Sequence, residues 1–357
     1  MAVNDSDPRT TTPLLEVSDL KTYFRTERGT VKAVDGVSFS LQRGQSLGIV
    51  GESGSGKTVL SRSIMGLLGR TNLIREGSIK FNGQELMGLS VKEMRSIWGQ
   101  EMSMIFQDPM TSLNPVMKIG RQIAEPLMLH LGMNKSEARL TAEKLLTDVR
   151  IPEPQRRLNQ YPHELSGGMR QRVMIAIALA CGPTLLFADE PTTALDVTVQ
   201  AEILQLINEQ RVDRNMSLIL VTHNIGVVAG NTDVIAVMYG GKIVEKAPTK
   251  TLFSSYKMPY TEALMRSIPK LRQASHTRLA TIPGRPPDMV NPPLGCNFAP
   301  RCAYARPKCL VEEPELTVTE NPEHVYACFY PVGSPEYHER KLELSQRVDS
   351  LSTGGQN

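Results

Sequence analysis

Gly51-Glu52-Ser53-Gly54-Ser55-Gly56-Lys57-Thr58 is the stretch that decides the fold, because its glycine spacing and its Lys-Thr ending are typical of a phosphate-binding loop. The loop follows the apolar run 46–50, a predicted strand, and precedes a predicted helix over 58–68. Glycines let backbone N–H groups turn inward around phosphates, and the helix adds its positive N-terminal end. We expect Lys57 to contact the outer phosphates and the Thr58 hydroxyl to bind Mg²⁺. The predicted ATP-binding residues of the loop are Ser53, Gly54, Ser55, Gly56, Lys57 and Thr58.

Short apolar runs alternate with helical patterns from Leu14 to about Lys246, which indicates an α/β domain with parallel strands. The predicted strands are 46–50, 102–106, 184–188, 217–222 and 234–239. The predicted helices are 58–68, 135–149, 169–181, 197–210, 225–229 and, beyond the alternating region, 260–267.

Two carboxylates end one of these strands, in the run Leu185-Leu186-Phe187-Ala188-Asp189-Glu190. Ligands gather at the carboxyl ends of strands in open parallel sheets. Asp189 is suited to the Mg²⁺ shell, and Glu190 to act as the base or orienting group for an attacking water. An Asp-Glu pair alone is usually a solvated turn, but a phosphate-binding loop upstream favours the catalytic interpretation.

A second helix start with phosphate-binding character lies in Leu165-Ser166-Gly167-Gly168-Met169-Arg170-Gln171-Arg172. A hydroxyl and two glycines precede an amphipathic helix there. Because the chain already has one phosphate-binding loop, the simplest use of this segment is to close over the γ-phosphate held by a partner chain.

In this set of motifs, the chain resembles the ATP-binding subunits of ABC transporters from Leu14 to about Tyr330. The resemblance implies a P-loop NTPase nucleotide-binding domain with a RecA-like core, an antiparallel β subdomain and a helical signature subdomain. It also implies that Phe24, or alternatively Tyr23, stacks on adenine. Gln107 would contact Mg²⁺ and water, and His223 would hold the γ-phosphate. The residues implied to contact the partner's ATP are Ser166, Gly167, Gly168 and Met169, with Asp196 in the loop that crosses the dimer.

Two positions depart from the family pattern: Met169 stands where Gln is commonest, and Asn224 follows the switch histidine where Asp is usual. Neither change removes a principal catalytic group.

The resemblance implies ATP hydrolysis in a sandwich of two such domains, whose closure is coupled to membrane subunits. ATP favours the closed dimer and so shifts that equilibrium.

Composition and domain boundaries fit this picture. The chain has 357 residues with 40 Lys plus Arg and 37 Asp plus Glu, a balance that gives no indication of a nucleic-acid partner. The longest apolar stretch, 173–187, is interrupted by Gly182 and Pro183 and is too short to span a bilayer. We predict a disordered tail over 1–13, the ATP-binding domain over 14–265, a Pro- and Cys-rich extension over 266–333 and a flexible tail over 334–357.

Four cysteines crowd into the extension with the spacing Cys296-x5-Cys302-x6-Cys309-x18-Cys328. Four clustered thiols in a reducing compartment are more often metal ligands than disulfides. The spacing is not that of a zinc ribbon, yet both zinc and an iron–sulfur cluster accept four cysteines. The segments Gly295-Cys296 and Pro300-Arg301-Cys302 resemble the C-terminal extension of peptide-importer ATPases. That resemblance implies a [4Fe-4S] cluster, with Zn²⁺ as the alternative and free structural thiols as a third interpretation.

The extension and the segment 107–115 together indicate an importer of di- or oligopeptides. The same subfamily includes nickel and glutathione importers, and other subunits choose the cargo. The implied partners are two transmembrane permeases, an extracytoplasmic binding protein and a second ATPase that can be a paralogue. The implied location is the cytoplasmic face of the bacterial inner membrane. Rival interpretations are a soluble ABC-type ATPase, a non-hydrolysing regulatory subunit and an exporter.

Overall fold

The computed structural model describes residues 12–69, 71–192, 196–268 and 282–353. Its centre is an eight-stranded sheet of order β11-β12-β10-β9-β3-β8-β7-β6. The five strands from β9 to β6 are parallel to one another, whereas β10, β12 and β11 continue the sheet beyond β9 by antiparallel pairing. The strands are β3 (Ser46–Val50), β6 (Met102–Ile105), β7 (Leu185–Asp189), β8 (Ser217–Thr222), β9 (Val234–Tyr239), β10 (Lys242–Pro248), β11 (Thr317–Val318) and β12 (Val325–Tyr326).

Both faces of the central sheet are buried, which explains why its parallel strands are continuously apolar in sequence. In β8, Leu218 and Leu220 belong to one hydrophobic cluster while Ile219 and Val221 belong to another. Strands β3, β8 and β9 have the predicted bounds, and β6 and β7 differ from prediction by a residue at one or both ends. The parallel α/β core is therefore confirmed.

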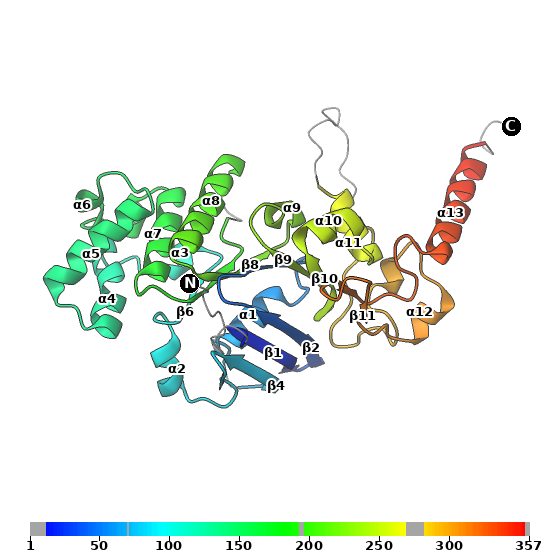
Figure 1. Ribbon diagram of the computed structural model, residues 1–357, viewed down its shortest axis with the longest axis horizontal. Coiled ribbons are helices and arrows are strands. Elements are labelled where there is room, and N and C mark those ends of the chain that lie inside the picture. Colours follow the sequence, from blue (N-terminus) through cyan, green and yellow to red (C-terminus); the bar gives the residue numbers. More distant parts are fainter. Residues whose placement is uncertain (1–11, 70, 193–195, 269–281, 354–357) are drawn as a thin grey trace, which may run out of the picture.

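A four-stranded antiparallel sheet of order β2-β1-β4-β5 covers one face of the core together with α1 (Lys57–Ile64), as Figure 1 shows. Its strands are β1 (Leu15–Thr26), β2 (Gly29–Leu41), β4 (Leu73–Phe81) and β5 (Gln84–Glu85), followed by α2 (Val91–Ile97). Helix α1 ends before the predicted Leu68, because Gly66 turns the chain with a φ of +65°.

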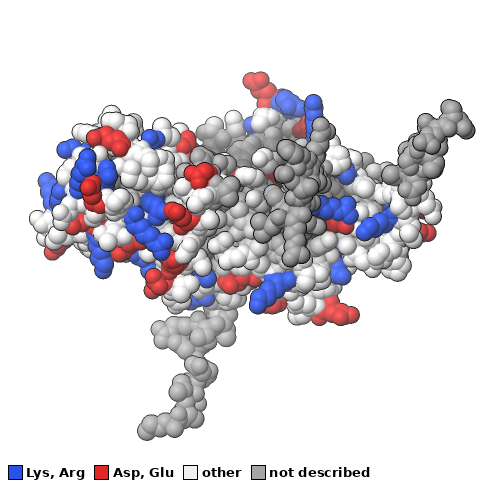
Figure 2. All heavy atoms as spheres, turned by 90° about the horizontal axis from the view of Figure 1, so that it is seen from above, with Lys and Arg blue, Asp and Glu red and all other residues white. Residues whose placement is uncertain are grey.

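A helical subdomain lies at one end of the molecule (Figure 1), where α4, α5 and α7 pack on one another. Its elements are α3 (Pro109–Ser112), α4 (Ile119–Leu131), α5 (Lys135–Asp148), α6 (Pro154–Arg157), the 3-10 turn Pro162–Glu164 and α7 (Gly167–Leu179). Acidic and basic side chains are intermixed on the face of this subdomain seen in Figure 2. Helices α8 (Val197–Asp213) and α9 (Ile225–Val228) complete the α/β alternation.

The extension follows α10 (Thr249–Ser255) and α11 (Pro259–Arg266) and contains only short elements. Proline density explains this, since proline removes donors from helices and ladders. The extension nevertheless joins the core sheet, because Val325 and Tyr326 of β12 pair with Lys246 and Glu245 of β10. Its other elements are the 3-10 turn η3 (Ala299–Arg301), α12 (Pro307–Val311) and β11.

The C-terminal segment, for which we predicted a flexible tail from its polarity, contains a helix. Residues Pro335–Thr353 form α13, which begins with a proline at its first position. Tyr337 is 2% exposed and holds the helix to the extension, and Arg340 pairs with Glu343 one turn on. Residues 354–357 and most of the expected N-terminal tail, 1–11, lie outside the described residues. Among the helices described, none has the length and apolar character needed to cross a membrane.

Candidate functional site

The phosphate-binding loop joins β3 to α1 and depends on glycine at particular positions. Gly54 and Gly56 have φ values of +82° and +101°, which side chains disfavour. A Cβ on Gly51 would lie 2.1 Å from the carbonyl oxygen of Met238, and one on Gly56 would lie 2.2 Å from that of Ala33. The loop can therefore be built only with these glycines. Ser53 and Gly54 are exposed, whereas Ser55 is buried.

Lys57 lies folded over the inside of this loop. Its Nζ atom donates to the carbonyl oxygens of Gly51 at 2.8 Å and Glu52 at 3.0 Å, and the residue is 4% exposed. Burial lowers the pKa of Lys57, while Glu190 and Asp189 oppose that shift. A cation held by carbonyl dipoles inside a loop of backbone N–H groups is well suited to phosphate oxygens.

Thr58 and Asp189, both predicted to bind Mg²⁺, meet across the end of the sheet. The Thr58 hydroxyl donates to Asp189 Oδ1 at 3.0 Å. Asp189 is fully buried, burial raises its pKa, and its Oδ2 atom has no hydrogen-bond partner among the described residues. Such an orphaned carboxylate oxygen beside a hydroxyl fits a hard cation with oxygen ligands.

Three predicted catalytic side chains converge next to this pair. Gln107 Nε2 donates to Glu190 Oε2 at 3.2 Å, and His223 Nδ1 lies 3.3 Å from the same oxygen. Glu190 has a φ of +46°, held by a hydrogen bond from its backbone N–H to Val221 O at 2.9 Å. Gln107 comes from the end of β6, Glu190 from β7 and His223 from β8. The sheet therefore brings together groups that lie far apart in the sequence.

The signature residues begin α7, in the helical subdomain. Ser166 is the N-cap, and its hydroxyl accepts from Met169 N at 3.3 Å. Ser166 and Gly167 are exposed, Gly168 is half-buried, and Met169 packs against the core. Asp196 is likewise an exposed N-cap, whose carboxylate accepts from Val199 N at 3.0 Å. Because Ser166, Gly167 and Asp196 are exposed, both helix starts are accessible at the surface of this chain.

The two candidate aromatic residues on β1 have different surroundings. The Tyr23 hydroxyl donates to Asp35 Oδ1 at 2.5 Å, and burial together with that carboxylate raises the pKa of Tyr23. Side chains alternate along a strand, so Phe24 shares a face with Thr22. The Thr22 hydroxyl bonds to Ser63 of α1 at 2.6 Å. This placement favours Phe24, the ring on the side of α1, over Tyr23.

The four clustered cysteines line one small cavity, whose wall also includes Met258, Phe298 and Tyr304. All five cysteines of the chain are unbridged. Burial raises the pKa of the Cys302 and Cys328 thiols to about 12 and also raises that of Cys296. Within the described residues no three His, Cys, Asp or Glu side chains are spaced to hold a metal ion as they stand. The thiols are thus gathered in one place without forming a finished coordination shell.

Sequence reasoning missed one part of the site, namely that the extension reaches the phosphate-binding loop. Arg301 forms an ion pair with Glu52, the second residue of that loop. The signal in the sequence was the motif Pro300-Arg301-Cys302, from which we predicted a role for the cysteine and none for the arginine.

Comparison with known proteins agrees with this geometry. Residues 34–193 match the family model described as "ABC transporter", and residues 244–309 match "Oligopeptide/dipeptide transporter, C-terminal region". The chain is 47% identical to the oligopeptide transport ATP-binding protein OppD of Salmonella typhimurium, with coverage of 91% of this chain and 96% of that protein. It is 48% identical to the dipeptide transport ATP-binding protein DppD of Escherichia coli, with coverage of 89% and 97%.

A solved structure also matches: an ATP-binding cassette in a dimeric post-hydrolysis state with ADP and phosphate. It is 26% identical, has a TM-score of 0.60, and the match covers 66% of this chain and 98% of that one. The fold and site thus define an ATP-hydrolysing ABC cassette. Within that class, the chain belongs to the family of oligopeptide and dipeptide transport ATP-binding proteins.

Proposed function

We propose that this chain couples ATP hydrolysis to the uptake of di- or oligopeptides across the cytoplasmic membrane. The observation that carries the proposal is 47–49% identity to peptide-transport ATP-binding proteins over about nine-tenths of the chain, the C-terminal region included. Nickel or glutathione is the alternative cargo, because importers of this subfamily take up these compounds too and leave the choice of cargo to other subunits.

The proposed hydrolytic roles follow the geometry of the site. Lys57 and the loop N–H groups bind the β- and γ-phosphates, and Phe24 stacks on adenine. Thr58, Asp189 and Gln107 would hold Mg²⁺, which neutralises charge on the phosphate oxygens when bound. Glu190 orients a water and accepts its proton while the water oxygen bonds to the γ-phosphorus. The bond from that phosphorus to the bridging oxygen breaks, and His223 steadies the γ-phosphate.

The exposed starts of α7 and α8 support a second ATPase subunit as partner. Ser166, Gly167, Gly168 and Met169 would contact ATP held by that subunit, with Asp196 beside them. A paralogue fits this role as well as a second copy. Two permeases and an extracytoplasmic peptide-binding protein complete the proposed assembly, which would hold this chain at the cytoplasmic face of a bacterial inner membrane.

The cysteine cavity supports a metal centre in the extension, and we assign it a [4Fe-4S] cluster with Zn²⁺ as the alternative. Cys296, Cys302, Cys309 and Cys328 would hold it. Four thiols around one small cavity favour a soft metal that displaces their protons. Its contribution would be bracing, since the extension has little core of its own. Iron and acid-labile sulfide in anaerobically purified protein would support the cluster, and zinc alone would support the alternative. A protein that contains neither iron nor zinc would contradict both assignments.

The experiment that tests the transport proposal uses the chain purified anaerobically with its neighbouring transport subunits in lipid vesicles. ATP hydrolysis is measured with empty and peptide-loaded binding protein, for the wild type and for Glu190→Gln. We expect stimulation by loaded protein and a loss of about 10²–10⁴-fold in the variant. Glu209→Gln, at an exposed ion pair with Arg150, is the matched control.

Hydrolysis that responds only to nickel or glutathione would move the assignment to that cargo. Hydrolysis indifferent to every permease would contradict a transport role and favour a soluble ATPase.

A further inference from the structure

One partly buried ion pair ties the Cys-rich extension to the phosphate-binding loop. Arg301 ends η3, directly before Cys302, and its side chain is 4% exposed. Its Nη1 atom donates to Glu52 Oε2 at 2.5 Å and its Nη2 atom donates to Oε1 at 3.0 Å. Two parallel charge-assisted bonds of this kind fix both the distance and the orientation of the carboxylate.

The remaining donors of Arg301 are also used. Nε donates to Pro283 O at 2.8 Å, Nη2 to Ile282 O at 3.1 Å and Nη1 to the Tyr239 hydroxyl at 3.3 Å. All three guanidinium nitrogens are therefore bonded, and the ring of Tyr239 lies 5.9 Å away. A lysine cannot reproduce this planar fork.

The main chain of Glu52 is hydrogen-bonded to Lys57 and to the backbone of the phosphate-binding loop. Its carbonyl oxygen accepts from Lys57 Nζ at 3.0 Å and from Ser55 N at 3.2 Å. Its backbone N–H donates to the buried Tyr260 hydroxyl at 2.8 Å. The main chain of Glu52 thus shapes the loop and orients Lys57, while its side chain is anchored in the extension.

A second line of contacts supports the same region. Asn297 Nδ2 donates to Gly240 O at 3.2 Å, and Gly241 N donates to Ser55 O at 3.1 Å. Tyr239, Tyr260 and Phe298 form an aromatic cluster with ring centroids 4.5–5.2 Å apart. Phe298 belongs to the extension, so the loop, the core sheet and the extension share one packed unit.

We propose that Arg301 is a positioning residue for ATP binding, and that the extension pre-organises the phosphate-binding loop through the Arg301–Glu52 pair. A loop held in its binding geometry loses less conformational freedom when phosphate binds, so ATP affinity is higher. This inference rests on the family's ATP hydrolysis and is independent of the proposed cargo.

The test compares Arg301→Gln, Arg301→Lys, Glu52→Gln and the double variant Glu52→Gln/Arg301→Gln in the full chain. Binding of a fluorescent ATP analogue gives Kd, and hydrolysis by the assembled transporter gives KM and kcat. The matched control is Arg306→Gln, because Arg306 lies in the same extension but pairs with Glu339 of α13.

We expect Arg301→Gln and Glu52→Gln each to raise Kd and KM for ATP about tenfold, the equivalent of about 1.4 kcal/mol, while kcat changes less than twofold. Arg301→Lys should be intermediate, and Arg306→Gln should match the wild type. The double variant should be no weaker than either single variant, because both substitutions break the same interaction.

An unchanged Kd and KM in Arg301→Gln would overturn the proposal, and so would a double variant whose loss is the product of the two single losses. If Arg301→Gln does not fold, as judged by its thermal unfolding, Glu52→Gln and Arg301→Lys decide the outcome by the same criteria. Stimulation by loaded binding protein, measured on the same preparations, tests the transport role separately.

Discussion

At the level of single residues, Glu190 has a backbone conformation that is less stable than those a side chain normally adopts. Its φ of +46° lies in the left-handed region, where a side chain costs about 1–2 kcal/mol relative to glycine. Such backbone strain persists at functional sites when the surroundings impose it. Here the bond to Val221 O and the contacts with Gln107 and His223 keep the carboxylate at the end of β7.

Comparing Glu190→Gly with Glu190→Ala separates the strain from the chemistry. Both variants should lose hydrolysis, because both lack the carboxylate. Glu190→Gly should nevertheless be about 0.5–1 kcal/mol more stable than Glu190→Ala, since glycine adopts this backbone without strain but has more freedom in the unfolded chain. Urea unfolding of the two proteins measures the difference. Equal stabilities would mean that the left-handed backbone at this position is not strained.

At the level of elements, Tyr337 is the buried anchor among the described side chains of α13, and Arg306 of the extension adds bonds to Glu336 O and Glu339. The Tyr337 hydroxyl donates to Glu262 Oε1 at 2.8 Å and lies 3.2 Å from the Tyr304 hydroxyl, while Arg266 pairs with the same Glu262 oxygen at 2.7 Å. Helices gain most of their stability from tertiary packing. We infer that α13 is held to α11 and the extension mainly at its first turn.

Tyr337→Phe should therefore loosen α13 more than the rest of the fold. Loss of the hydroxyl removes a bond to a nearly buried carboxylate and should cost about 1–2 kcal/mol. Hydrogen exchange should speed up over residues 338–346, while the core strands keep their protection. Leu342→Ala is the control, because Leu342 is 63% exposed. Uniformly faster exchange in the whole protein would contradict a local anchor.

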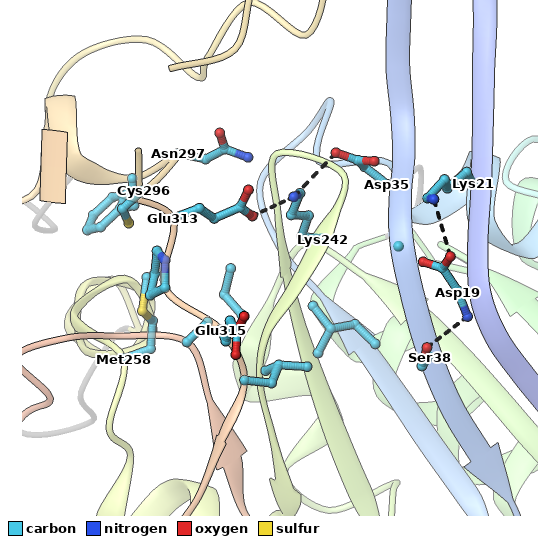
Figure 3. Close-up of a pocket in the computed structure, with 17 residues that line it drawn as sticks. Asp19, Lys21, Asp35, Ser38, Lys242, Met258, Cys296, Asn297, Glu313 and Glu315 are labelled. Atoms are coloured by element: carbon cyan, nitrogen blue, oxygen red, sulfur yellow. Dashed lines mark hydrogen bonds and ion pairs between the residues drawn. The ribbon is translucent and has the colours of Figure 1, made fainter. Parts of the chain in front are cut away.

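At the level of the whole molecule, charged side chains join the antiparallel sheet, the core sheet and the extension. Figure 3 shows Lys242 of β10 between Asp35 of β2 and Glu313 of the extension, with the Asp35 contact at 3.3 Å. Burial by itself would raise the pKa of Asp35, but the Tyr23 hydroxyl and the Lys242 ammonium group hold it below its ordinary value of 3.8. The ionised form of Asp35 therefore stabilises the fold.

A depressed folded-state pKa gives stability that is present above the unfolded value and is lost as pH falls through the folded value. Asp35→Asn should be about 1–2 kcal/mol less stable than the wild type at pH 5–7, because a charge-assisted bond is lost. The difference should shrink below about pH 4, as the wild-type carboxylate is protonated. Thermal unfolding across this range measures it, with Asp288→Asn at an exposed ion pair as control. A stability difference that stays constant down to pH 2 would contradict the proposed contribution of ionised Asp35 to stability.

The sequence by itself determined the core strands, the phosphate-binding loop and the polar side chains that follow the core strands. These features depend on local signals: buried parallel strands are continuously apolar, and a loop around phosphate needs glycines that no other residue replaces. Lys57, Thr58, Asp189 and Glu190 could be assigned on this basis. Gln107 and His223 needed the resemblance to a family, since a lone amide or histidine at a strand end carries no distinctive pattern.

Only the tertiary structure decided how the extension meets the core. The pairing of β12 with β10, the anchoring of α13 and the contact of Arg301 with Glu52 join residues up to 249 positions apart. No periodicity or spacing records such contacts, because they depend on the complementary shape and charge of surfaces that meet only when the chain has folded. The sequence marked the cysteines of the extension, and the fold showed that their neighbour Arg301 reaches the loop that binds phosphate.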